Sequence, residues 1–514
     1  MTRGARLGIA AACLVAVAIV GPLLAVASRA EGWGGLRASD WAALRFTLWQ
    51  AALSAALSIL LAIPVARALA RRVFPGRSAL VLLLGAPFIL PVIVAVLGLV
   101  AMFGQTGIVN TALGWIGIDP ISIYGPQGVI LAHVFFNMPL ATRLILQGWL
   151  AIPGERLRLA ASLGFGPADT ARFLEWPMLR RLAPGLFVVI FLICTTSFAV
   201  ALALGGGPRS TTVELAIYQA FRFDFDLGRT ALLGAIQLSL GGLAAWASLR
   251  LPLPSGFGAG LDRQVPRWDS AGLGLRVQDA LAIFIATTFL LLPMALVLTG
   301  GLIALTDIGA TVWWATLRSL LIAVTAGIAT LGLAMAMAVA ATGPRGARWI
   351  EIVGTLPIAA SPLVLGVGLY ILVLPVADPI ALALPIVVLV NIVLALPFAL
   401  RSLIPAMGDL RRDYDRLSAS LGMTGMTWLR LVAWPRLRRP AGFAGGLAAA
   451  LAAGDLGVIA LFAAPDQATL PLVLYQLMGS YRMEEAKAAA LILVALSLGL
   501  FWIFERGGRR ASAG

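Results

Sequence analysis

A succession of long, nearly uncharged apolar segments limits the possible folds most strongly. A helix that crosses a bilayer needs about 20 predominantly apolar residues. Only 12% of the 514 residues are charged, about half the share that is typical of soluble domains. The sequence therefore predicts an all-α polytopic membrane protein with about 12 transmembrane helices. The predicted spans are 7–28, 47–70, 79–103, 128–149, 184–206, 229–249, 279–304, 312–341, 348–375, 379–400, 440–464 and 485–505.

The placement of basic residues predicts the orientation of these spans. With the N-terminus in the cytoplasm, 29 of the 38 Lys and Arg residues fall on the inner side and 9 on the outer side. Cytoplasmic loops collect such residues, so both termini are expected in the cytoplasm. The same bias accounts for the formal charge of +15, and no nucleic-acid partner is expected.

The first apolar segment has two interpretations. Arg3 and Arg6 followed by an apolar core and Ala25-Val26-Ala27 resemble a cleavable signal peptide. The apolar run is longer than a usual signal core, which favours a retained helix. Neither interpretation changes the orientation of the remaining spans.

The chain contains an internal repeat. Trp41-Ala-Ala-Leu-Arg45 recurs as Trp314-Ala-Thr-Leu-Arg318, and from the fourth span onward the offset settles at 258 residues. We predict two six-span halves, 1–249 and 279–514, joined by a cytoplasmic linker at 250–278. Six spans return the chain to its starting side, so the halves form a parallel repeat about an axis along the membrane normal.

Two polar cytoplasmic loops, 152–181 and 404–439, repeat at this offset. Each reads as a helix, a glycine turn and a second helix, because Gly164 and Gly422 can adopt the left-handed backbone that ends a helix. Pro177 and Pro435 are expected to break the chain before the next span. One such loop alone is equally typical of an ordinary positive-inside loop. Two copies on one membrane face favour docking into a groove of another protein.

The spacing within these loops resembles the EAA loop of ABC importer permeases. The resemblance implies a coupling helix that sits in a cleft of a cytoplasmic ATPase dimer. It also implies a periplasmic substrate-binding protein and a location in the bacterial inner membrane. Arginine stands at Arg158 and Arg416, where the family has glutamate. The positions carried over are Arg158, Ala160, Gly164, Leu174 and Pro177 in the first loop, and Arg416, Gly422, Val432 and Pro435 in the second.

The chain lacks the sequence features of an ATPase. There is no G-x-x-x-x-G-K-[ST] motif, and the single lysine is Lys487. We therefore expect a transport subunit that is not itself an enzyme and binds no cofactor, with ATP-Mg held by the partner ATPase. One histidine and two cysteines far apart in sequence give no metal-ligand spacing, so no metal site is expected.

Over its whole length the chain resembles the thiamine permeases more closely than the ferric-iron permeases, which also fuse two halves. The resemblance is carried by 132–139, 204–208, 211–226, 173–177 and 479–482. It implies import of thiamine or its phosphates, with ferric iron as the alternative cargo. An ion-coupled secondary transporter would need several intramembrane acids, and a membrane-embedded enzyme would need clustered His, Asp or Glu; neither pattern is present in the sequence.

Candidate residues along the substrate path are few. Thiamine has a cationic ring, so acids and aromatic rings near the outer mouth would attract it, although an interfacial aromatic belt with solvated acids is the more ordinary interpretation. Asp455 is either a functional intramembrane acid or a ligand of loop backbone. His133 and its repeat counterpart Asn391 are expected to be structural. The candidates are Ser197, Tyr218, Asp224, Asp226 and Asp455.

Overall fold

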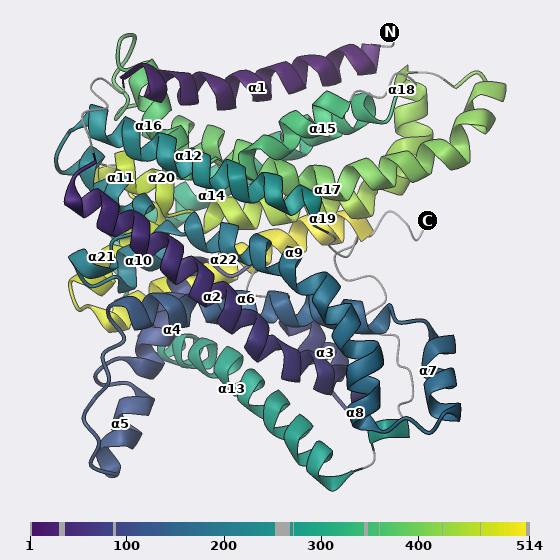
Figure 1. Ribbon diagram of the computed structural model, residues 1–514. Helices are drawn as coiled ribbons and strands as arrows, with labels where there is room; N and C mark the ends of the chain where they lie inside the picture. The colour runs from purple at the N-terminus through teal and green to yellow at the C-terminus, as the bar shows by residue number, and fades with distance from the viewer. Residues whose placement is uncertain are drawn as a thin grey trace.

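The computed structural model describes residues 3–29, 36–85, 89–251, 268–270, 272–343, 348–358, 360–423, 425–462 and 464–509. Throughout these ranges the regular elements are helices. They pack together as a helical bundle (Figure 1). The start of α1, the end of α22, and the segments α7 and α18 lie at one end of it. The short helices α11, α20 and α21 lie at the other end.

The first half of the chain contains helices α1 to α12. The longer ones are α1 (Arg3–Arg29), α2 (Ala38–Arg71), α6 (Pro126–Leu150), α9 (Trp176–Thr195) and α12 (Leu227–Arg250). The shorter ones are α3 (Arg77–Leu83), α4 (Val92–Phe103), α5 (Ile108–Trp115), α7 (Gly154–Ser162), α8 (Pro167–Thr170), α10 (Phe198–Leu204) and α11 (Val213–Arg222), with a π-helical segment η2 (Ala171–Glu175).

The second half repeats this series after a 3-10 turn in the linker, η4 (Trp268–Ser270). Its longer helices are α13 (Leu273–Ile303), α14 (Ala310–Ala341), α17 (Ala383–Ser420), α19 (Trp434–Ala453) and α22 (Met483–Arg509). Its shorter ones are α15 (Arg348–Thr355), α16 (Pro362–Val373), α18 (Gly425–Trp428), α20 (Gly457–Phe462) and α21 (Leu470–Gly479), with a second π-helical segment η7 (Leu429–Ala433).

Eleven helices of the described residues are long and apolar enough to cross a membrane, or up to 12 if one bent pair counts as a single span. This confirms the predicted fold class. Several predicted bounds are wrong. The tenth span was expected at 379–400, but its helix runs over Ala383–Ser420. The fifth was expected at 184–206, but its helix runs over Pro167–Thr195. The loops that flank these spans are themselves helical, so the change of polarity does not mark the end of the helix.

Two predicted continuous spans are broken instead. Within 79–103, α3 ends at Leu83 and α4 begins at Val92, directly after Pro91. Within 348–375, the helical segments Trp349–Ile358 and Pro362–Val373 meet at an angle of 101°. Proline has no backbone N–H to continue a helix, and Pro357 and Pro362 border this break. The hydropathy of these segments does not reveal either break.

The first helix of each half packs against the other half. Helix α1 contacts α14 and α16, and α13 contacts α2 and α4. Two close approaches between the halves place a glycine opposite a proline. A Cβ on Gly368 of α16 would lie 2.3 Å from the carbonyl oxygen of Pro22 in α1, and a Cβ on Gly98 of α4 would lie 2.8 Å from that of Pro293 in α13. Small residues permit such close backbone packing, so the two halves are interlocked by equivalent contacts.

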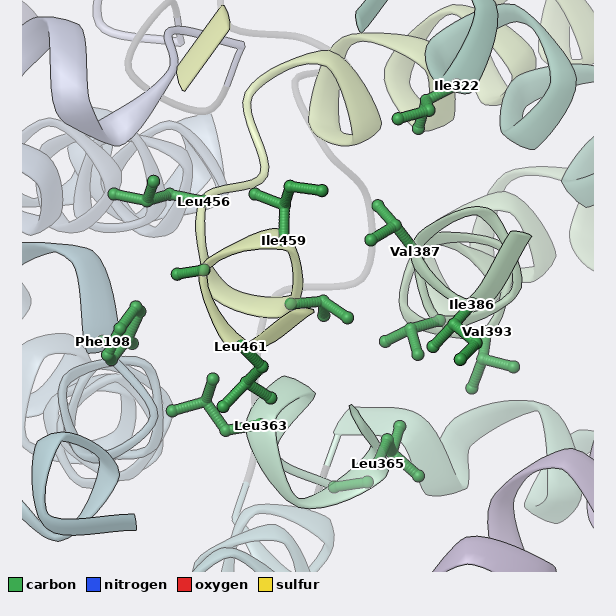
Figure 2. Close-up of a cluster of buried hydrophobic side chains, with 14 of the residues drawn as sticks. Phe198, Ile322, Leu363, Leu365, Ile386, Val387, Val393, Leu456, Ile459 and Leu461 are labelled. Carbon is green, nitrogen blue, oxygen red and sulfur yellow. The ribbon is translucent and has the colours of Figure 1, made fainter. Parts of the chain in front are cut away.

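Three short helices, α10, α16 and α20, meet where the halves adjoin. A Cβ on Gly457, the first residue of α20, would lie 3.8 Å from Pro362 of α16 and 3.9 Å from the ring of Phe198 in α10. Figure 2 shows Leu363 of α16 and Leu461 of α20 pointing toward one another, with Phe198 beside them. These side chains belong to one buried cluster drawn from both halves. This buried cluster therefore packs the two halves together at these short helices.

Candidate functional site

The two predicted glycine turns have the same geometry. Gly164 has a φ of +70° and Gly422 a φ of +66°, which confirms the left-handed backbone. In the first turn, the N–H of Gly164 donates to Ala161 and that of Phe165 donates to Ala160. The second turn repeats both bonds, from Gly422 to Ala419 and from Met423 to Ser418. Paired bonds of this kind form a Schellman motif, which ends a helix sharply.

Each turn carries an exposed apolar face that was not among the predicted site residues. Leu163 is 63% exposed and its counterpart Leu421 is 60% exposed. Large apolar side chains gathered on an otherwise polar loop are typical of a contact surface. The signal was present in the sequence, since apolar residues recur here at the repeat offset of 258 inside two Arg-rich loops. We call the residues of this set the coupling face: Leu159, Leu163, Phe173 and Trp176 in the first half, and Leu417, Leu421, Leu431 and Trp434 in the second.

The residues carried over from the family pattern have mixed positions. Ala160 and its counterpart Ser418 both have small side chains, and both are buried beneath the turns. Arg158 is exposed and bonds Glu155 of its own helix at 3.1 Å; Arg416 is exposed too. Leu174 is half-buried and Val432 is buried. No contact in the described residues tests the coupling role of any of them, so that role stays a prediction.

Pro177 and Pro435 do not break the chain, so that prediction is wrong. Helical structure runs on through both prolines. The turn before each is wider: the N–H of Trp176 bonds the carbonyl of Ala171, and the N–H of Trp434 bonds that of Leu429. Each proline then occupies the first turn of the next α-helix, where its missing N–H costs little. Helical structure thus continues from the π-helical segments η2 and η7 into the following spans.

The helices that lead into the two turns differ, which the repeat did not predict. In the first half, α6 ends at Leu150 and the short α7 follows. In the second half, α17 continues without a break to Ser420. The predicted loop 404–439 is therefore largely helical. The cause is visible at the repeat offset: Pro153-Gly154 interrupts the first copy, whereas Arg411-Arg412 stands in the second.

Different contacts hold the two units in place. In the first, the buried carboxylate of Glu175 bonds Arg67 of α2 at 2.8 Å. The indole N–H of Trp268 in the linker donates to the carbonyl of Phe165 at 2.8 Å. In the second, the guanidinium of Arg436 lies 4.0 Å from the ring centre of Tyr414. Each coupling turn is thus attached to the bundle by side chains from outside its own turn.

Two of the three acids predicted for the substrate path form ion pairs with arginine. Asp224 bonds Arg229 at 2.9 Å, and Asp226 bonds Arg37 at 3.2 Å. Arg229 also bonds the buried Asp40 at 2.7 Å. This network ties α11, α12 and the start of α2 together, so Asp224 and Asp226 carry little uncompensated charge for a cation.

Asp455 bonds its own loop. Its carboxylate accepts from the backbone N–H of Gly457 at 3.1 Å and from the amide of Asn391 at 3.2 Å. These contacts support the structural role expected for Asn391. Ser197, the counterpart of Asp455, is the N-cap residue of α10, but its side chain does not cap that helix. His133 is buried and its Nδ1 lies 2.8 Å from Gln50, which supports a structural role.

A buried acid that was not predicted lies nearby, on α11. Glu214 has no exposed surface, and its Oε2 accepts from the hydroxyl of Ser361 at 2.8 Å. Burial raises the pKa of this carboxyl to about 8, although the Ser361 and Gln237 side chains partly offset the rise. The available sequence signal was a lone glutamate in an apolar stretch. Tyr218, one turn further on, packs its ring 5.2 Å from that of Phe198.

Known proteins resemble this chain over nearly its whole length. It is 41% identical to the thiamine transport system permease protein of Brucella abortus, over 97% of this chain and 94% of that protein. The chain belongs to this permease family. The corresponding Escherichia coli protein is 38% identical over 97% of this chain and 96% of its own length. The Haemophilus influenzae protein is 34% identical over 89% and 86%. No family model matches the chain.

The resemblance predicted from the sequence is therefore confirmed at the level of the family. Full-length relatives with thiamine in their names leave the ferric-iron permease and the secondary transporter without comparable support. In the part of the chain that the structure describes, no cluster of three or more His, Cys, Asp or Glu side chains could hold a metal ion.

Proposed function

We propose that this chain is the membrane permease of an ATP-driven importer that carries thiamine or its phosphates from the periplasm to the cytoplasm. Whole-length identity to thiamine transport permeases carries the proposal. The paired Schellman turns with their exposed apolar faces support the ATP-driven class. A secondary transporter does not require two equivalent surfaces for docking a dimeric partner.

Each end of the bundle offers a binding place for one proposed partner. At one end, the two halves of the coupling face suit an ATP-binding cassette ATPase dimer that binds ATP-Mg, since each subunit would receive one turn. A periplasmic substrate-binding protein would deliver cargo at the opposite end, where α11, α20 and α21 lie. The 29 to 9 distribution of basic residues supports a bacterial inner-membrane location with both termini in the cytoplasm.

Deletion of the gene should reduce thiamine uptake to background in cells kept at limiting vitamin. Uptake of radiolabelled thiamine measures this, and a plasmid copy of the intact chain should restore it. Copies of the partner ATPase alone should not restore it. Normal thiamine uptake in the deletion strain would refute the proposed cargo, while retained assembly with an ATPase would still support the importer class.

The coupling face should be required for ATPase binding. Leu163→Asp combined with Leu421→Asp places a charge where an apolar contact is expected, and each buried leucine side chain contributes about 1.5–3 kcal/mol. Copurification of the ATPase with the tagged permease should fall at least about tenfold. The matched control is Ser162→Asp with Ser420→Asp, which adds the same charge at neighbouring exposed positions and should copurify normally. Equal copurification by both variants would exclude the coupling face from the contact.

A further inference from the structure

The seam between α11 and α16 joins the two halves at the end of the bundle that holds α11, α20 and α21. Ser361 is the N-cap of α16: its hydroxyl accepts from the N–H groups of Leu363 and Val364. The same hydroxyl donates to Glu214 of α11 at 2.8 Å. Ser361 belongs to the second half and Glu214 to the first. A carboxyl group of one half is thus held by a single hydroxyl group of the other.

Among the described residues Glu214 has no ion-pair partner; the side chains that interact with it, Ser361 and Gln237, are both neutral. The nearby acids differ in this respect, since Asp40, Asp224 and Asp226 all bond arginine. A fully buried carboxyl group without a cation is expensive to maintain. A buried polar group that lacks a full set of partners calls for an explanation beyond packing.

Aromatic rings follow the same seam. Tyr218 and Phe221 lie four and seven residues after Glu214, a spacing that places all three on one face of a helix. The Phe221 ring packs edge-on against Tyr370 of α16, with 5.0 Å between centroids. Tyr370 in turn stacks on Phe462 of α20 at 6.1 Å. The seam therefore combines one uncompensated acid with aromatic rings from both halves.

The repeat shows that the shared fold does not require this acid. Helix α21 is the counterpart of α11, and it packs against α4 as α11 packs against α16. Tyr218 corresponds to Tyr475 at an offset of 257, which places Pro471 opposite Glu214. The same helix pairing thus forms in the second half with proline at the position of the acid.

We propose that the α11–α16 seam recognises the cationic aromatic ring of the cargo, with the Glu214 carboxylate as its charge partner and Tyr218, Phe221 and Tyr370 as its ring partners. The proposal rests on the proposed function, because thiamine carries a cationic ring. In the closed seam the hydroxyl of Ser361 covers Glu214. When the halves rock apart to admit cargo, Ser361 withdraws and the carboxylate is exposed to it. The positive ring then stabilises the ionised acid and lies against the aromatic faces.

The test uses the complete importer with its ATPase and binding protein, reconstituted in proteoliposomes and supplied with radiolabelled thiamine. Glu214→Gln keeps the size of the side chain and its bond to Ser361 but removes the charge. Thiamine import should fall about tenfold, while ATP hydrolysis stays within about twofold, so the ratio of thiamine imported to ATP hydrolysed falls. Glu214→Asp retains the charge and should keep that ratio close to wild type.

Ser361→Ala separates recognition from a purely structural latch, because it removes the bond across the seam and leaves the carboxylate. Import by this variant should remain near wild type. Equal losses in Glu214→Gln and Ser361→Ala would overturn the proposal in favour of a latch. An unchanged import ratio in Glu214→Gln, or its failure to accumulate in the membrane, would also overturn it. If the wild-type importer carries no thiamine, the proposed function itself fails, which is a separate outcome.

Discussion

Replacing Gly164 and Gly422 together by valine should abolish thiamine uptake while the permease still reaches the membrane. Their φ values of +70° and +66° lie in the left-handed region, which costs an L-residue about 1–2 kcal/mol and a β-branched one more. No atom lies within 4 Å of a Cβ placed at either position. The effect therefore acts through the backbone alone: the Schellman motif is lost and the coupling face moves.

A double replacement by asparagine is the matched control, because asparagine tolerates the left-handed conformation. It should retain most of the uptake. Radiolabelled thiamine uptake measures the effect, and immunoblots of the membrane fraction correct for expression. If the valine variant imports as well as the asparagine variant, the sharp turn has no part in coupling. Each single valine variant should lose less, since the other turn remains intact.

The sequence was most informative where a property repeats along the chain. Twelve apolar runs predicted the membrane fold, because span length is set by the bilayer. The glycine turns were predictable because Gly164 and Gly422 occur at one offset in equivalent loops. The broken spans were not predictable in this way, since the hydropathy of α15 and α16 does not reveal a 101° bend. Pro177 and Pro435 predicted breaks that do not occur. A π-helical turn before each proline allows the helix to continue.

The pairing and burial of the candidate side chains depend on how the helices pack, which local sequence patterns do not predict. Asp224 and Asp226 suggested a cation path, but Asp224 pairs with Arg229, five residues further on, and Asp226 pairs with Arg37, 189 residues away. Glu214 was missed because its significance lies in a contact with Ser361, 147 residues away in the other half. Exposure of Leu163 and Leu421 likewise follows from the orientation of the turns. For Asp226 and Glu214, contacts with distant segments, rather than local spacing, determine which group each carboxylate bonds.

The contact of Gly368 with Pro22 should be among the least tolerant in the protein. A Cβ on Gly368 would lie 2.3 Å from the Pro22 carbonyl oxygen and 2.6 Å from its carbonyl carbon. These are backbone atoms, so neither can rotate away, and α1 and α16 must separate. Overpacking of this kind typically costs about 1–3 kcal/mol and sometimes more. Because α1 contacts α14 and α16 of the second half, the loss would spread across the junction of the halves.

Gly368→Leu should therefore reduce the detergent-extractable folded permease several-fold and lower its melting temperature. Gly21→Ala is the matched control in the same helix pair, because its Cβ would meet only the Leu372 side chain, at 3.7 Å; it should be neutral. Gly98→Leu should repeat the defect at the equivalent contact with Pro293. Size-exclusion chromatography and thermal melts measure all three. A defect in Gly98→Leu without one in Gly368→Leu would mean that α1 is absent from the folded protein, which favours the cleavable-signal interpretation of the first segment. Defects in both variants would favour a retained helix that is required to hold the two halves together.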